Sequence, residues 1–266
     1  MARKIIVPDM WMGEPIAGSI ERMLRRPAPV EDTPDEKNKV VAPSTAPIAG
    51  KESYLILPAK KHGSYEYPDL LVAMGNKYHH QDWHTSKTSL EAEDAFKLTI
   101  RQYVDFLAML DSGAAHDGNG NKVQSSLLTQ ILEDITKVRD PWRSEWADAR
   151  FENKQTGTKY SVVPKNDLHI AYHQFNPQGT LTEVVEPVDG ALMEDRKIDF
   201  AYWLKNATPQ GLPSADTPVG DFHYWYPRAG KVAGFVAYSD GANLSCNWYP
   251  RVASASFGVR PVRKKN

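Results

Sequence analysis

Residues 230–262 read GKVAGFVAYSDGANLSCNWYPRVASASFGVRPV, and this stretch decides the predicted fold. Apolar or small residues alternate with more changeable ones along two runs, which is the pattern of two β-strands with one buried face. Asp240-Gly241 marks the turn between the runs, and Pro250 ends the second run because proline has no N–H to donate to a sheet. Buried positions are predicted at Phe235, Ala237, Leu244, Cys246 and Trp248.

The residue types in this stretch are unusual. Residues 235–256 contain no Lys, Glu, Gln or Met, although 24% of the whole chain is charged. Except for Trp248, every residue there can be reached from an asparagine codon by changing only the first two bases. Mutagenesis directed at adenines in such codons would leave this set of residues. A short strand pair could also lack the missing types by chance, so the pattern alone leaves both explanations open.

The residues predicted to face outward have the composition of a binding surface. Aromatic side chains supply rigid contact area and small polar side chains supply adaptable hydrogen bonds, as in antibody paratopes. Tyr and Asn are also ordinary residues on an exposed strand face, which is the alternative interpretation. The candidate ligand-binding residues are Val236, Tyr238, Asp240, Asn243, Ser245, Asn247, Tyr249, Arg251, Val252 and Ala255, with Trp225 and Trp248 flanking them.

Three short motifs resemble a known family. SFGVRP at residues 256–261 follows a segment rich in Tyr, Ser, Asn and Asp, and resembles the C-terminus of variable proteins diversified by retroelements. MEDRK at 193–197 and YWYPR at 224–228 resemble segments of the archaeal and phage-associated members. The similarity covers residues 52–262, and its C-terminal motif also occurs in lectin-fold proteins that are not diversified.

The resemblance implies a fold and a function. The display domain of that family has a C-type lectin-like fold of the formylglycine-generating-enzyme kind, and it binds ligands without catalysis. The enzymes of that fold use a cysteine-based active site, whereas Cys246 is the only cysteine here. The resemblance therefore implies a non-enzymatic display protein whose variable region spans about residues 230–262, with an unidentified protein or glycan as its ligand.

Composition excludes several classes of function. Lys and Arg total 32 against 33 Asp and Glu, so no overall positive field attracts nucleic acid. A single cysteine rules out an intrachain disulfide and a cysteine-based metal site. No run approaches the roughly 20 apolar residues of a spanning helix, so membrane insertion is not expected. We also expect no cofactor.

The chain is predicted to have an N-terminal arm and one folded domain. Residues 1–50 contain a proline-rich, charged stretch typical of a linker, and residues 51–266 are the predicted ligand-binding domain. The arm could attach the domain to a particle or to a sister subunit in a homo-oligomer. The N-terminus shows no signal-peptide pattern, so we expect synthesis in the cytoplasm, and a virion or cell surface would be reached by a non-Sec route.

The elements expected along residues 51–266 predict an α+β fold, with helices packed on a mainly antiparallel sheet and long irregular loops. Thr99 and Gln102 have the spacing of a capping box, which predicts a helix over 100–111. Strands are expected at 54–58, 70–74, 158–163 and 169–173, a loop at 59–67, and helices opening at 88–91, from 125, at Asp140-Pro141 and at 200–204.

One stretch suggests an alternative function. His79, His80, Asp82 and His84 could supply ligands for zinc in a lectin-fold metal-dependent module or enzyme. The stretch lacks the HExxH spacing, so a structural role is favoured. The pair His169 and His173 and the Asp-Gly-Asn-Gly-Asn run at 117–121 are likewise interpreted as structural, because the latter lacks the glycine and glutamate of a calcium loop.

Overall fold

The computed structural model describes residues 10–11, 14–15, 50–156 and 165–265. The chain divides into two units, Met1–Ser44 and Thr45–Asn266. In the first unit, β1 (Met10–Trp11) pairs antiparallel with β2 (Glu14–Pro15). The rest of the predicted arm, and the strand predicted at 158–163, lie outside the described residues.

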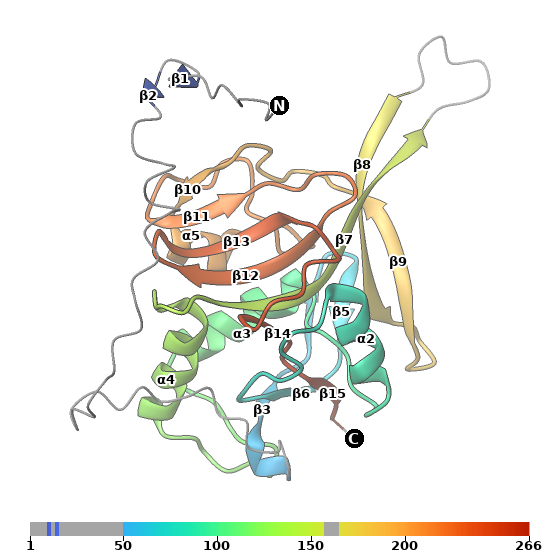
Figure 1. Cartoon of the computed structure of the whole chain (residues 1–266). Helices are drawn as coiled ribbons and strands as arrows, with labels where there is room; N and C mark the ends of the chain where they lie inside the picture. Colours follow the sequence, from blue (N-terminus) through green and yellow to red (C-terminus); the bar gives the residue numbers. More distant parts are fainter. Residues whose placement is uncertain (1–9, 12–13, 16–49, 157–164, 266) are drawn as a thin grey trace, which may run out of the picture. The chain divides into compact units, whose positions relative to one another are not determined.

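An eight-stranded sheet dominates the second unit (Figure 1). Neighbouring strands run antiparallel except for the pairs β11–β13 and β14–β7, which are parallel. The strand order is β10 (Arg196–Ile198), β11 (Phe222–Trp225), β13 (Gly241–Trp248), β12 (Val232–Tyr238), β7 (Arg143–Thr156), β8 (Lys165–Phe175) and β9 (Leu181–Pro187), with β14 (Phe257–Gly258) also on β7.

Two smaller sheets complete the strands of this unit. In the first, β6 (Leu70–Ala73) lies between β3 (Tyr54–Leu57) and β15 (Val262–Lys264). The second is the hairpin of β4 (Lys60–His62) and β5 (Tyr65–Tyr67). The predicted loop at 59–67 is therefore wrong. Tyr65 and Tyr67 point into the core, so this segment alternates as a strand does.

Four α-helices occur in the described part of the chain: α2 (Trp83–Glu91), α3 (Ile100–Asp111), α4 (Ser125–Thr136) and α5 (Phe200–Asn206), preceded by the short 3-10 helix η1 (Lys51–Ser53). The capping box of α3 is confirmed, because Thr99 and Gln102 each accept from the other's backbone N–H. The helix predicted to open at 88–91 instead ends there. Asp82 is the true N-cap, and its carboxylate accepts from the Thr85 N–H.

The prediction of a helix at Asp140-Pro141 is wrong, since β7 begins at Arg143. Trp142 and Trp146 fit a helical spacing, but the same residues also fit the two-residue period of a strand. The segment forms a strand because both faces of that strand are covered by other parts of the domain. Trp146 is buried on one face and Ala147 on the other, each fully.

The main core lies between the large sheet and the helices α3 and α5. Tyr103 of α3 packs on Phe235 of β12 with ring centroids 4.3 Å apart, and Trp203 of α5 stacks near the same ring at 6.1 Å. A smaller cluster on the opposite face of the sheet contains Trp146, Val232 and Phe257. The architecture is thus α+β with mostly antiparallel sheets.

Candidate functional site

The predicted strand pair is present as β12 and β13. Tyr238 pairs with Gly241, so the turn consists of Ser239 and Asp240, one residue earlier than the predicted Asp240-Gly241. Phe235 and Leu244 lie opposite each other and are buried in the main core, as their apolar character predicts. The strand pair therefore forms a fixed part of the domain.

Several residues predicted to face outward are buried. Val236 is 1% exposed, Asn243 2% and Ser245 7%, so the prediction that these three display their side chains is wrong. The reason is that the second face of the sheet also packs, because Trp146 and Phe257 stack there with centroids 3.9 Å apart. His223 and Trp225 of β11 lie in register beside Asn243 and Ser245.

The other candidate residues are accessible to different degrees. Tyr249 is 66% exposed, and Asp240, Arg251 and Ala255 are also exposed. The exposed candidates thus gather at the turn after β12 and in residues 249–256, which we call the 249–256 loop. The half-buried candidates are Trp225, Tyr238, Asn247, Trp248 and Val252.

The backbone of the 249–256 loop is held from outside. Four of its carbonyl oxygens accept hydrogen bonds from residues that belong to α2, β7 or the segment before α2. The bonds run from Trp83 N to Pro250 O (3.0 Å), His80 N to Ser254 O (3.1 Å), His79 Nδ1 to Ala255 O (3.0 Å) and Ser144 N to Ser256 O (2.8 Å). Because these acceptors are main-chain atoms, the bonds do not depend on which side chains the loop carries.

The side chains of the loop make few contacts by comparison. Tyr249, Arg251, Ala253 and Ala255 alternate along the loop and are all exposed. The Lys231 ammonium lies 2.9 Å from the centre of the Tyr249 ring, a cation–π contact. Arg251 makes no hydrogen bond or ion pair with any described residue. The loop therefore combines a backbone held by outside donors with exposed side chains at alternate positions, while Val252 packs against the cluster of Trp146 and Phe257.

The histidine-rich stretch supports this loop and the start of α2. His79 donates to the Ala255 carbonyl, and burial lowers the pKa of its imidazole. Asp82 caps α2, and the hydrogen bond that its carboxylate accepts from the Thr85 N–H lowers the pKa of that carboxylate. Among the described residues, no group of three or more His, Cys, Asp or Glu could hold a metal ion.

The segment after the loop is anchored in the core. Lys77 and Val259 exchange two backbone hydrogen bonds of 2.9 Å. Arg260 is fully buried, and its guanidinium bonds both carboxylate oxygens of Glu145 at 2.6 and 3.0 Å. Burial opposes ionisation of Glu145, but the Arg260 and Arg143 charges outweigh burial and hold its pKa below the usual range. Gly258 lets the backbone pass close to Asn76, since a Cβ at residue 258 would lie 2.9 Å from Asn76 Nδ2.

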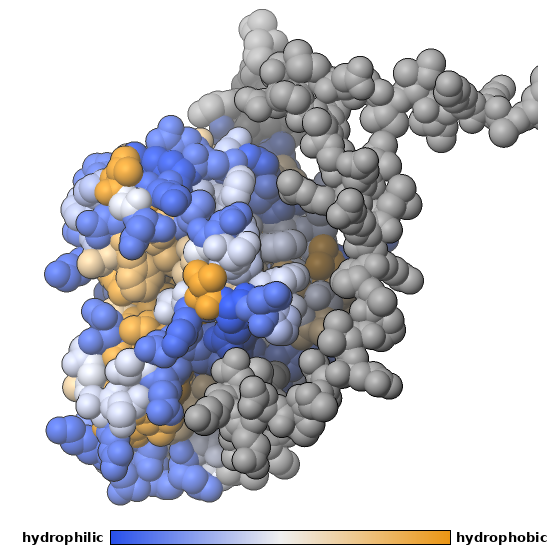
Figure 2. All heavy atoms as spheres, turned by 60° about the vertical axis from the view of Figure 1, so that its left-hand side comes forward, coloured by the Kyte–Doolittle hydropathy of each residue, from blue (hydrophilic) through white to orange (hydrophobic). Residues whose placement is uncertain are grey.

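A cavity of about 480 Å³ opens beside the turn of the strand pair. Val236, Tyr238 and Trp248 from the candidate set line it, together with Arg139, Asp140 and Trp142. The indoles of Trp142 and Trp248 are parallel within 5°, with centroids 6.2 Å apart. Figure 2 shows the side of the molecule that carries α4, where apolar residues gather between hydrophilic regions.

Some polar atoms on this face of the sheet have no hydrogen-bond partner. They are Asn243 Oδ1, His223 Nε2 and Trp248 Nε1, all inaccessible to solvent. His223 and Asn243 are cross-strand neighbours in register. Buried polar groups are normally satisfied, so unpartnered atoms at one place are characteristic of a binding surface or of a site for ordered water.

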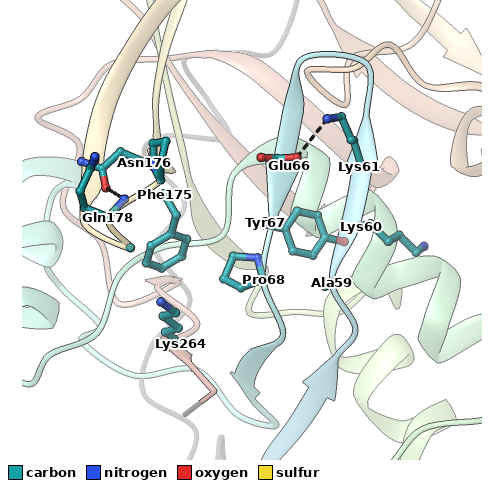
Figure 3. Close-up of a pocket in the computed structure, with 12 residues that line it drawn as sticks. Ala59, Lys60, Lys61, Glu66, Tyr67, Pro68, Phe175, Asn176, Gln178 and Lys264 are labelled. Carbon is teal, nitrogen blue, oxygen red and sulfur yellow. Dashed lines mark hydrogen bonds and ion pairs between the residues drawn. The ribbon is translucent and has the colours of Figure 1, made fainter.

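A larger cavity, of about 600 Å³, lies between the β4–β5 hairpin and the end of β8 (Figure 3). Phe175 and Lys264 lie across it from Tyr67 and Pro68. Its lysines are mostly engaged: Lys60 pairs with Asp105 at 3.0 Å, and Lys61 with Glu66 at 3.2 Å. This cavity therefore offers little free charge to a ligand.

Sequence reasoning missed Lys97, which is almost completely buried. Its ammonium donates to the Trp83 carbonyl and lies 4.1 Å from the centre of the Trp83 ring. Burial lowers the pKa of Lys97 to about 7, and the nearby Asp148 charge opposes that shift. No sequence pattern marks this residue, because only the fold places the strand that carries Asp148 beside it. Asp148 also hydrogen-bonds His173, which raises the pKa of the imidazole.

Arg139, Asp140 and Trp142 were also missed as site residues, since the sequence placed them at the start of a helix.

None of the described helices is both long and apolar enough to cross a membrane. Comparison of the chain with protein families, with curated proteins and with solved structures finds no match.

Proposed function

We propose that this protein is a non-enzymatic ligand-binding protein that displays variable side chains on a fixed backbone. The observation that carries the proposal is the 249–256 loop. Four of its carbonyls are held by donors outside the loop, while Tyr249, Arg251, Ala253 and Ala255 point to solvent. Substitution of exposed side chains that make no structural contacts changes stability little, so such a loop tolerates many sequences.

The residue types in the loop support the same function. Residues 235–256 are limited to types that adenine-directed mutagenesis of asparagine codons can produce, Trp248 excepted. The SFGVRP motif contributes Phe257 and Arg260, both fully buried, so these two residues serve the core while the exposed residues of the loop remain accessible. We accordingly propose a variable protein of a diversity-generating retroelement, with a C-type lectin-like domain.

Burial restricts which residues serve this function. Tyr238, Asp240, Tyr249, Arg251, Val252 and Ala255 are at least partly accessible, whereas Val236, Asn243 and Ser245 are not. We propose that the accessible set contacts the ligand and that the buried set fixes the strand pair. His79 and Asp82 already serve the backbone of this region, so no observation favours the metal-dependent alternative.

Sequencing the locus in its natural population tests the proposal. Nonsynonymous substitutions are expected to concentrate at the codons of Tyr249, Arg251, Val252 and Ala255, and within them at template adenines. Codons 144–150 of β7 are the matched control, because they encode a buried strand of the same sheet. Substitutions spread evenly over both regions, and mostly synonymous, would contradict the proposal.

A further inference from the structure

We infer that the cavity beside Trp142, Tyr238 and Trp248 binds a cationic side chain, arginine or lysine, of a protein ligand. This inference rests on the proposed function and names the chemistry of its ligand. Three aromatic residues line the cavity, and the ring planes of Trp142 and Trp248 are parallel within 5°. Trp and Tyr faces attract cations electrostatically, and the guanidinium of arginine also stacks on them.

The aromatic walls are held rigidly. The Phe257 ring stands nearly perpendicular to Trp142, at 87° and 5.4 Å, and to Trp248, at 85° and 5.0 Å. Phe257 is itself fully buried and stacks on Trp146. Side chains fixed before binding lose little conformational entropy when a ligand arrives, so this wall is prepared for recognition.

The charges around the cavity favour a cation. Asp140 lines it, is exposed, and forms no ion pair with a described residue. Asp240, next to Ser239 in the cavity lining, also has no cationic partner in the described ranges. The one cation in the lining, Arg139, shares Asp134 with Arg143 and Arg260, and these three guanidiniums face two carboxylates, Asp134 and Glu145. With Asp140 and Asp240 added, four carboxylates stand against three guanidiniums, so the local charge is negative by one.

The size of the cavity fits one long side chain with part of its backbone. Its volume, about 480 Å³, lies within the range of pockets that bind small ligands, roughly 300–1,000 Å³. A neutral sugar could also stack on the indoles, but it would leave Asp140 and Asp240 without a counter-charge. The unpaired carboxylates thus favour a basic peptide segment over a glycan.

The test is an NMR titration of the full chain labelled with ¹⁵N, following the indole N–H signals. The probes are acetyl-Gly-Arg-Gly-amide and its citrulline analogue, which has nearly the same shape without the charge. We expect the arginine peptide to shift the signals of Trp142 and Trp248, assigned with W142F and W248F, and to bind about fivefold or more tightly than the citrulline peptide.

The variant D140N should weaken arginine binding by about fivefold, and D189N, which removes an exposed carboxylate elsewhere, should leave it unchanged. Equal binding of the two peptides, no shift at about 10 mM peptide, or tighter binding of cellotetraose at the same indoles would overturn the inference. Such a failure is distinct from failure of the proposed function, which depends on where substitutions fall in the 249–256 loop.

Discussion

The strand pair β12–β13 and the 249–256 loop are adjacent in the chain and have the same residue types, yet they differ in accessibility. Val236, Asn243 and Ser245 in the strands are buried, whereas Tyr249 and Arg251 in the loop are exposed. Strand side chains lie between two packed layers, while the loop is held through its carbonyls. Accessibility for display is therefore set by what holds the backbone and not by composition.

The largest expected effect comes from breaking the anchor that follows the loop. Replacing Glu145 by Ala leaves the fully buried Arg260 only Asp134, 3.8 Å away and shared with Arg139 and Arg143, among the described carboxylates, so the free energy of unfolding should fall by about 3–5 kcal/mol. Urea denaturation measures this change. E91A, which removes the exposed partner of Lys87, is the matched control and should cost at most about 0.5 kcal/mol. Similar costs for both variants would mean that Arg260 is not the anchor.

A second pair of variants compares the strands and the loop directly. Val236→Asn puts an amide at a position that is 1% exposed, and should destabilise the protein by about 2–4 kcal/mol. Arg251→Asn introduces the same residue in the loop and should change stability by less than about 0.5 kcal/mol. Thermal and urea unfolding of both variants provide the measurement. Equal effects would remove the distinction between the two regions.

A third prediction concerns Lys97, which supports the loop through Trp83. The folded protein binds fewer protons than the unfolded chain between pH 7 and the ordinary lysine pKa, because burial lowers the Lys97 pKa to about 7. Stability should therefore rise between pH 7 and 8.5, by about 1 kcal/mol per pH unit from this group. The variant K97M should lose that slope. An unchanged slope in K97M would show that Lys97 is not neutral in the folded protein.

The smallest expected effect comes from the hydrogen bond between His79 Nδ1 and the Ala255 carbonyl. Replacing His79 by Ala should cost about 1 kcal/mol at pH 7. Burial lowers the His79 pKa, so the folded wild type should lose stability as pH falls below about 6.5, where the unfolded imidazole gains its proton. The difference between wild type and H79A should shrink at pH 5. A constant difference from pH 7 to 5 would contradict this assignment.

Local patterns predicted several elements well. Helix α3 was found from the capping box at Thr99 and Gln102, and the strand pair from its alternation and its turn. Those signals lie within a few residues of each other, so the sequence carries them completely. The hairpin β4–β5 is local but was missed because each of its strands is only three residues long. The strand β7 was missed because the tryptophans at its start also fit a helical spacing and because one of its partners, β12, lies far away in the chain.

The candidate site was predicted only in part, for the same reason. Alternation showed that one face of β12 and β13 differs from the other, but it could not show that Trp146 and Phe257 pack on the second face. The support of the loop by His79, His80 and Trp83 depends on contacts about 170 residues apart, such as His79 with Ala255. Such contacts leave no local pattern.

The small sheet of β3, β6 and β15 has a consequence for the order of the chain. The first and last strands of the domain flank the same strand, β6, and Gly50 and Lys265 line one cavity. A short linker could join these residues, and new ends could be opened at the exposed turn of Pro177 and Gln178 between β8 and β9. Such a circular permutant would keep every strand pairing described above for the second unit. The order of the strands along the chain could thus be changed without changing the packing that supports the 249–256 loop. The domain could then be fused to other proteins through its original ends or through the new ones.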